Sequence, residues 1–216
     1  MGAIARNIAN KITTSGVFTS GAITNSSVTG ITVLANASDG ITFISSQTAS
    51  NSASLSFTSG LDSTYKAYKF VFSSIHPRTD NVAFSFNFSI DAGSNYNVTK
   101  TTTWFRAYHT EDDSFTILNY EGGQDLSQST AFQELSAGDI GNDADQSLSG
   151  SFTLFNPSST TYVKHFISTV NYTHGSNITS NNFIAGYGNT TSAVNAIQFK
   201  TSSGNFDGTI YLYGIK

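Results

Sequence analysis

The sequence predicts an all-β protein, an antiparallel β-sandwich most simply arranged as a jelly roll, with an extended N-terminal arm. Strand-forming residues are abundant, with 17 Phe, 10 Tyr and 28 Thr in 216 residues. From about residue 41, short apolar-polar segments alternate with clusters of Gly, Asn, Ser and Asp, as in a chain of strands and turns. No segment after residue 40 has a helical period of useful length. Many short strands in one domain of this size favour a sandwich.

Residues 1–40 are expected to form an arm or stalk outside the main domain. Isoleucines recur every four residues over 4–12, which fits a short helix, but a frayed terminus explains the spacing equally well. Residues 13–30 carry no charge and too few apolar side chains for a core of their own. We expect the arm to be ordered by what it contacts. The residues assigned to attachment and oligomerisation are Ile4, Ile8, Ile12, Val17, Phe18, Ile23 and Val28.

Residues 41–216 are expected to form the sandwich head, and its clearest strand is AFSFNFSID. The period of two predicts one buried and one solvated face. The buried set is Phe84, Phe86, Phe88 and Ile90, and the solvated set is Ser85, Asn87 and Ser89. Further strands are expected in TWFRAYH, LSGSFTLFN, TYVKHFISTVNY, AVNAIQFKTS and GTIYLYGI, and turns in GDIGNDADQ, NPSSTT, THGSNITSNN, GNTTS and SSGNFDG.

Charge and composition argue against several classes of partner. The net charge is −4 and there is no basic run, so we expect no nucleic acid partner. No apolar stretch approaches the roughly 20 residues that a membrane-spanning helix needs, so no membrane partner is expected. The chain has no cysteine, which excludes disulfides and thiolate metal sites.

The acidic segment GDIGNDADQ contains the weak metal candidates Asp139, Asp143 and Asp145. Hard cations such as Ca²⁺ bind several oxygens at loop spacing, and Asp143 and Asp145 are two residues apart. The segment lacks the glycine and the distal Glu of an EF-hand loop, so a solvated turn is the preferred interpretation. We therefore expect no metal and no cofactor.

Catalytic signatures are also missing from the sequence. The four histidines form no H-x-x-x-H or H-x-H pair, and no G-x-S-x-G motif surrounds any of the 33 serines. Nothing in the sequence selects a pair of carboxylates for glycoside hydrolysis. The protein is therefore expected not to be an enzyme.

Three aromatic residues are candidates for glycan contacts. Tyr96, Trp104 and Tyr108 lie in or after the turn segment DAGSNYN, where aromatic faces stand beside amides and carboxylates. This mixture suits sugar stacking and hydrogen bonding. For Trp104 the alternative, a place in the sandwich core, is favoured because large aromatic side chains dominate cores.

Three segments of the expected head stand out together: FSIDAGSNYNVTKTTTWFRAYH, GNDADQSLSGSFTLFNPSSTTYVKHFIS and GYGNTTSAVNAIQFKTSSGNFDGTIYLYGIK. Together they resemble a family of virion structural proteins of tailed bacteriophages, common in phages of aquatic bacteria. The resemblance covers roughly residues 41–216. It implies a β-sandwich displayed on a particle as a small oligomer, often a trimer, with no catalytic residues to transfer. The arm lies outside the resemblance, which fits an adaptation to one particular virion.

The expected function is therefore that of a non-enzymatic virion structural protein, anchored to the capsid or tail by its arm. It would act as a capsid decoration, a fibre or a tail appendage, in contact with copies of itself and with other virion proteins. The alternative is a glycan-binding adhesin whose head recognises the host surface. A depolymerase is a weaker third hypothesis.

Overall fold

The computed structural model describes residues 40–216. The chain divides into two units, Met1–Asp39 and Gly40–Lys216, and only the second is described below. The predicted arm and its short helix therefore lie outside the described residues. The same holds for the attachment residues Ile4, Ile8, Ile12, Val17, Phe18, Ile23 and Val28.

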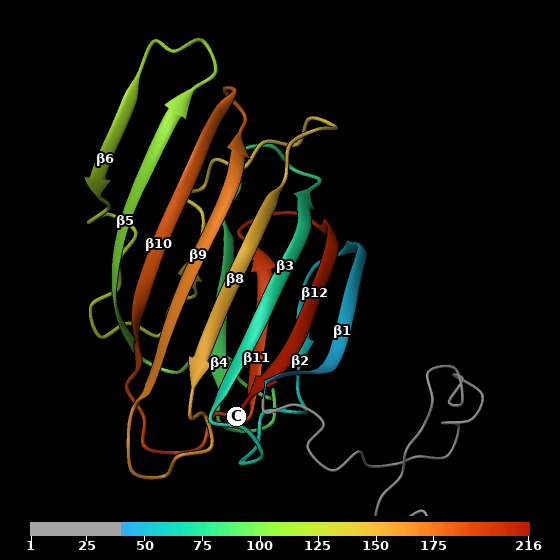
Figure 1. The fold of residues 1–216 in the computed structure, drawn as a ribbon, viewed down its shortest axis with the longest axis vertical. Coiled ribbons are helices and arrows are strands. Elements are labelled where there is room, and N and C mark those ends of the chain that lie inside the picture. The colour runs from blue at the N-terminus through green and yellow to red at the C-terminus, as the bar shows by residue number, and fades with distance from the viewer. Residues whose placement is uncertain (1–39) are drawn as a thin grey trace, which may run out of the picture. The chain divides into compact units, whose positions relative to one another are not determined.

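Residues 40–216 form twelve strands and no helix, so the described part holds no helix long and apolar enough to cross a membrane (Figure 1). The all-β prediction is confirmed. The strands are β1 Ile41–Ser52, β2 Leu55–Phe57, β3 Ala67–Pro77, β4 Phe84–Ser89, β5 Lys100–Thr110, β6 Thr116–Tyr120, β7 Gln133–Glu134, β8 Leu148–Phe155, β9 Lys164–His174, β10 Ile178–Gly188, β11 Ala196–Thr201 and β12 Phe206–Ile215.

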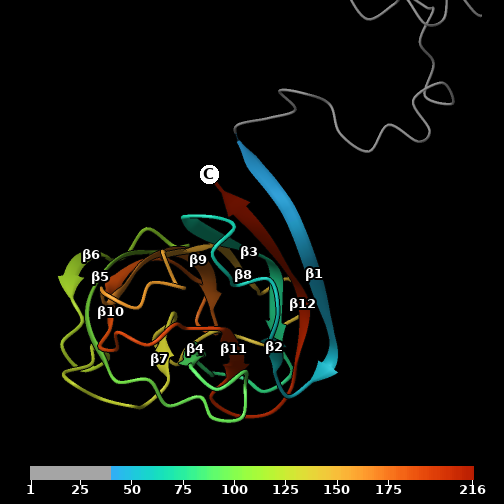
Figure 2. The same ribbon diagram turned by 90° about the horizontal axis from the view of Figure 1, so that it is seen from below.

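Two antiparallel sheets of unequal size pack face to face, which confirms the predicted β-sandwich. The larger sheet has eight strands in the order β1-β12-β3-β8-β9-β10-β5-β6, and the smaller has four in the order β2-β11-β4-β7. Viewed along the strands, the larger sheet curls over the smaller one (Figure 2). The jelly-roll arrangement in particular stays a prediction.

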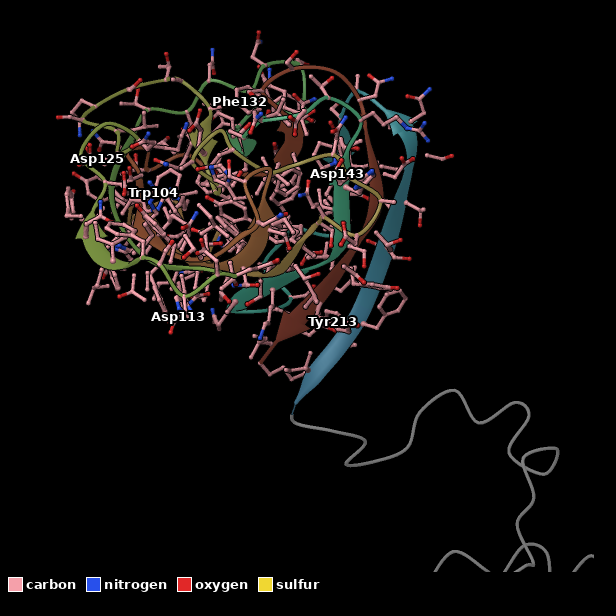
Figure 3. The ribbon with its side chains drawn as sticks, turned by 90° about the horizontal axis from the view of Figure 1, so that it is seen from above. Trp104, Asp113, Asp125, Phe132, Asp143 and Tyr213 are labelled. Carbon is pink, nitrogen blue, oxygen red and sulfur yellow. The ribbon has the colours of Figure 1, made fainter. Side chains whose placement is uncertain are left out.

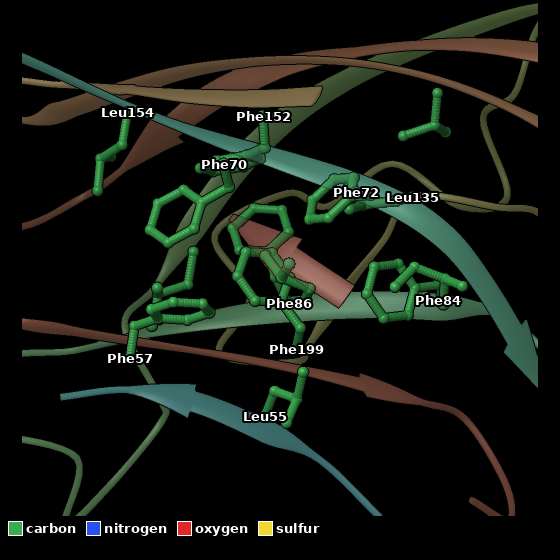
Figure 4. Packing of buried hydrophobic residues seen from close by; sticks show 14 of the residues in the cluster. Leu55, Phe57, Phe70, Phe72, Phe84, Phe86, Leu135, Phe152, Leu154 and Phe199 are labelled. Atoms are coloured by element: carbon green, nitrogen blue, oxygen red, sulfur yellow. The ribbon is translucent and has the colours of Figure 1, made fainter. Parts of the chain in front are cut away.

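The core between the sheets is a layer of phenylalanine rings (Figure 4). Phe84, Phe86 and Phe88 of β4 are fully buried, as the alternation predicts. The Phe86 ring centroid lies 4.6 Å from that of Phe152 on β8 and 5.0 Å from that of Phe166 on β9. These contacts join the small sheet to the middle of the large one, and such edge-to-face pairs add stability beyond the burial of area.

The rest of the β4 prediction is wrong. Ile90 lies one residue past the end of the strand and is 44 % exposed. The three polar residues expected to face solvent, Ser85, Asn87 and Ser89, are buried. Loop segments cover this outer face of β4: the Asn87 amide donates to the carbonyls of Tyr96 at 2.7 Å and Thr130 at 2.9 Å. Both faces of β4 are therefore inside the protein.

One predicted turn is also partly a strand. The segment THGSNITSNN was expected to be irregular, but β10 begins at Ile178 inside it. Ser180 and Asn182 point inward and are buried, and the Asn182 amide donates to the carbonyl of Leu135 at 2.9 Å. A strand with polar residues on its inner face gives no apolar alternation, so its pattern resembled a turn.

We predict that Phe86→Ala lowers the free energy of unfolding by about 3 to 5 kcal/mol, because the lost ring leaves a cavity among other aromatic side chains. Chemical denaturation measures the change. Ile90→Ala is the control, with an expected loss below about 0.5 kcal/mol because the side chain is largely exposed. Equal effects of the two variants would show that the Phe layer does not dominate the core.

Candidate functional site

Four charged or titratable side chains meet on the inner face of the large sheet. The Arg106 Nε on β5 lies 2.6 Å from the Glu121 carboxylate, and an Arg106 Nη lies 3.3 Å from that of Asp139. His174 Nε2 on β9 lies 3.3 Å from the same Asp139 oxygen. We call Arg106, Glu121, Asp139 and His174 the ion cluster. Its side chains are only 12 to 22 % exposed, so the pairs are weakly screened.

Tyr172 is hydrogen-bonded to the ion cluster from β9. Its hydroxyl donates to the second Asp139 oxygen at 2.6 Å. Burial raises the pKa of Tyr172 to about 12, and the Asp139 carboxylate adds to this shift. The phenol therefore stays a hydrogen-bond donor at any physiological pH and does not act as a base.

The hollow that borders the ion cluster has a volume of about 80 Å³. It is lined by Arg106, Tyr108, Asp139, His174, Ile178 and Ser180. Binding sites for small organic molecules usually measure about 300 to 1,000 Å³. The contacts of Arg106 and His174 with Glu121 and Asp139 fasten the segment that carries the two carboxylates onto β5 and β9.

We predict that Arg106→Met lowers the free energy of unfolding by about 3 kcal/mol, because two shielded carboxylates lose their shared cation. Arg78→Met is the matched control. Arg78 pairs with Asp207 at 2.8 Å, but its side chain is 50 % exposed. Exposed pairs contribute less than about 1 kcal/mol. Thermal and urea unfolding measure both variants, and equal losses would contradict the fastening role.

Two lysines are buried at the opposite end of the same strands. Lys100 on β5 and Lys164 on β9 flank Gly188 of β10 in register, and both are fully buried. The Lys100 Nζ donates to Asn87 Oδ1 at 2.5 Å and to the Val98 carbonyl at 2.8 Å. None of the ion pairs among residues 40–216 includes either lysine. Burial therefore lowers the pKa of Lys100 to about 7 and also lowers the pKa of Lys164.

This burial makes stability depend on pH in a defined direction. Below pH 7 both the folded and unfolded chains hold the Lys100 proton, and the cost of burying the charge is fully present. Between pH 7 and the ordinary lysine value of 10.5, only the unfolded chain holds it. Stability therefore rises with pH across this window, by up to about 1.4 kcal/mol per pH unit.

We predict that Lys100→Met reduces this slope between pH 7.5 and 9.5, because Met has no proton to lose. Urea denaturation at several pH values measures the slope. Lys66→Met is the control, since Lys66 is exposed and its removal leaves the buried amines in place. A slope that is the same in wild type and Lys100→Met would mean that Lys100 stays charged in the folded protein.

The three metal candidates are not brought together. Asp139 belongs to the ion cluster, whereas Asp143 and Asp145 are exposed in the following turn. That turn is closed by the Gln146 N–H, which donates to the Asp143 carbonyl at 2.9 Å. Residues 40–216 contain no group of three or more His, Asp or Glu side chains placed to hold a metal ion.

The three glycan candidates do not form one surface. Trp104 is fully buried in the core, so its assignment as a glycan contact is wrong and the alternative holds (Figure 3). The Tyr108 ring faces inward, with the Arg106 guanidinium 5.0 Å from its centroid. Tyr96 lies beside Asn87, at the Lys100 end of β5. Lys100 and Tyr108 are eight residues apart on that strand, about 26 Å, so Tyr96 and Tyr108 cannot grip the same sugar.

An apolar surface at the start of the domain was not predicted. Ile41 and Phe43 of the edge strand β1 are 58 % and 55 % exposed. Phe43 packs edge-on against Tyr213 of β12 at 5.7 Å, and Ile41 is in register with Ile215. We call Ile41, Phe43, Tyr213 and Ile215 the edge patch, and Tyr213 is labelled in Figure 3. The segment GTIYLYGI is apolar at nearly every position, so its sequence could not indicate which side is buried.

Comparisons of the chain with protein-family models, with curated proteins and with solved structures find no match. The resemblance to phage virion proteins therefore stays a prediction.

Proposed function

We propose that the protein is a non-enzymatic structural protein of a phage virion. In this proposal the β-sandwich is the displayed head, an oligomer that is a trimer in the resembling family. The N-terminal arm anchors each subunit to the capsid or tail. The support comes from the resemblance, from a fold whose inner charged groups are used in fastening contacts, and from one exposed surface.

The edge patch is the observation that carries the proposal. An exposed strand edge with large apolar side chains is a liability in a monomer, because its free backbone groups and apolar area favour association. Ile41 and Phe43 lie within the first four described residues, where the chain continues into residues 1–39. Contacts between subunits at this point would bring the arms of neighbouring copies together. This suits a subunit that assembles and attaches at the same end.

We predict that the full-length double variant Ile41→Asn, Phe43→Asn stays folded but loses self-association, because the contact area loses its apolar side chains. Sedimentation velocity measures the mass, with Ile90→Asn as the control at another exposed isoleucine.

We predict that a chain starting at Asp39 stays folded and soluble but does not bind to virions that lack the protein. Adding it back to such virions and measuring how much binds tests this.

Two outcomes would contradict the proposal. A wild-type chain that sediments as a monomer at every concentration would remove the oligomer. A chain without residues 1–38 that still decorates particles at full occupancy would place attachment on the sandwich instead of the arm.

A glycan-binding adhesin is the second candidate function. It is favoured by the solvent-facing side of the large sheet, which carries exposed aromatic rings beside uncharged polar side chains. Its geometry differs from that expected from the sequence, because Tyr108 is the one predicted glycan contact among the residues that line the hollow on this face.

A further inference from the structure

The outer face of the large sheet carries a row of aromatic side chains that runs across three strands. The register places Tyr120 of β6, Phe105 of β5 and Phe183 of β10 side by side. The Phe105 and Phe183 rings are stacked, with centroids 4.9 Å apart and planes at 10°. Phe105 is 45 % exposed and Tyr120 is 55 % exposed. We call these three residues the aromatic row. It lies on the sheet face turned away from the small sheet, because the neighbouring Trp104 and Ile184 are buried on the inner face.

A hollow lies on each side of the aromatic row. The first hollow has a volume of about 540 Å³. Its floor is low because Ala107 occupies the centre, in register with Leu118 on one side and Asn181 on the other. Asn171 of β9 extends this row of residues across the strands. Thr116, His109 and Thr179 form the neighbouring row. The second hollow, about 500 Å³, lies between Thr103, Ala185, Ile167, Tyr187 and Phe155.

The lining of both hollows is uncharged apart from two histidine rings, since no Asp, Glu, Lys or Arg takes part. In the first hollow the Asn171 amide nitrogen donates to Thr179 Oγ1 at 3.0 Å and to the Ser180 carbonyl at 3.1 Å. Its carbonyl oxygen is left free to accept. The Asn181 amide has no hydrogen-bond partner among residues 40–216. The hollow thus offers amide donors and acceptors in fixed register. The charged side chain at its rim is Asp113, whose carboxylate lies 2.9 Å from His109 Nε2.

A sugar ring matches this combination. It has an apolar face that stacks on aromatic rings and a rim of hydroxyls that both donate and accept hydrogen bonds. The absence of cations argues against acidic polysaccharides, which need charge compensation. A second copy of the same face would match less well, because the aromatic row of each copy would have to fill the hollow of the other while leaving the amides unpaired.

We propose that the first hollow and the aromatic row bind a neutral polysaccharide strand. The aromatic row packs against the apolar face of a sugar, and Asn171 and Asn181 bond its hydroxyls. From Thr179 in the first hollow to Tyr187 in the second, β10 covers about 26 Å, so a strand running along it crosses the row and continues into the second hollow. The site is separate from the edge patch, so its test is independent of assembly.

The test uses the full-length protein in native gels that contain dextran, mannan, galactan or xylan, with hyaluronan as the acidic comparison. We expect at least one neutral polysaccharide to slow the wild type. Ala107→Arg should abolish this retardation by filling the first hollow. Phe183→Ala should weaken it about tenfold through the lost apolar contact of the aromatic row. Ser73→Arg is the matched control, because Ser73 is exposed on β3, outside both hollows.

Thermal melting of each variant shows that it is folded, and sedimentation reports its mass. The proposal is overturned if none of the four neutral polysaccharides slows the wild type, or if hyaluronan alone does. It is also overturned if Ala107→Arg and Ser73→Arg bind alike. A change of oligomeric mass in Ala107→Arg with unaltered retardation would assign the face to subunit contacts instead.

Discussion

The packing of a four-stranded sheet against an eight-stranded one governs the rest of this structure. The phenylalanine layer holds the two sheets together through β4 and β11, which contact the middle of the large sheet. Four strands cannot cover eight, so part of the inner face needs another cover. The segment between β6 and β8 supplies it, with Leu135 and Ile140 fully buried. Apart from the two residues of β7 this cover is a loop, and its backbone needs hydrogen-bond partners inside the protein.

The buried polar side chains follow from that need. Gln133 accepts from the Thr102 hydroxyl and donates to the carbonyls of Gln124 and Glu134. Asn182 reaches from the sheet to the Leu135 carbonyl, and Asn87 holds two loop carbonyls from the other side. Each such group is stable only while all its partners are in place. The loops are consequently part of the cooperative core, and the ion cluster fastens the same cover at its outer end.

Local sequence indicated β4 and five further strands, but it missed others even where the inner face is apolar, as in β3 with Phe70 and Phe72 buried. The patterns of β5, β8, β9, β11 and β12 were each predicted within a few residues. β10 was obscured by its buried polar residues Ser180 and Asn182. The Asn182 amide donates to a distant loop carbonyl, and the Ser180 hydroxyl donates to Asn182. On β4 the same reason holds for Asn87, which bonds loop carbonyls, whereas Ser85 bonds the Lys200 carbonyl of β11 and Ser89 bonds Asp91. An alternating pattern indicates only which face of a strand is apolar. It cannot indicate that a polar face is buried beneath a loop.

The candidate sites were harder to predict than the fold. The edge patch and the aromatic row exist because register aligns residues from strands far apart in the chain, such as Phe105 with Phe183. Asp139 was singled out for its acidic neighbours along the sequence, yet its real neighbours are Arg106, Tyr172 and His174. Local sequence patterns do not predict which residues become neighbours across strands, because the register depends on the whole sheet.

The pairing of the first strand with the last has a mechanical consequence. β1 runs antiparallel to β12 from Ile41 opposite Ile215 to Ser52 opposite Phe206, and β12 is paired in turn with β3. Tension that enters at residue 40 and is resisted at the far end of the sheet acts along β1. The hydrogen bonds of the pair lie across that direction, so they are sheared together instead of being opened one by one. A head pulled along β1 would therefore withstand a larger force than one in which the same strand is peeled off from the side.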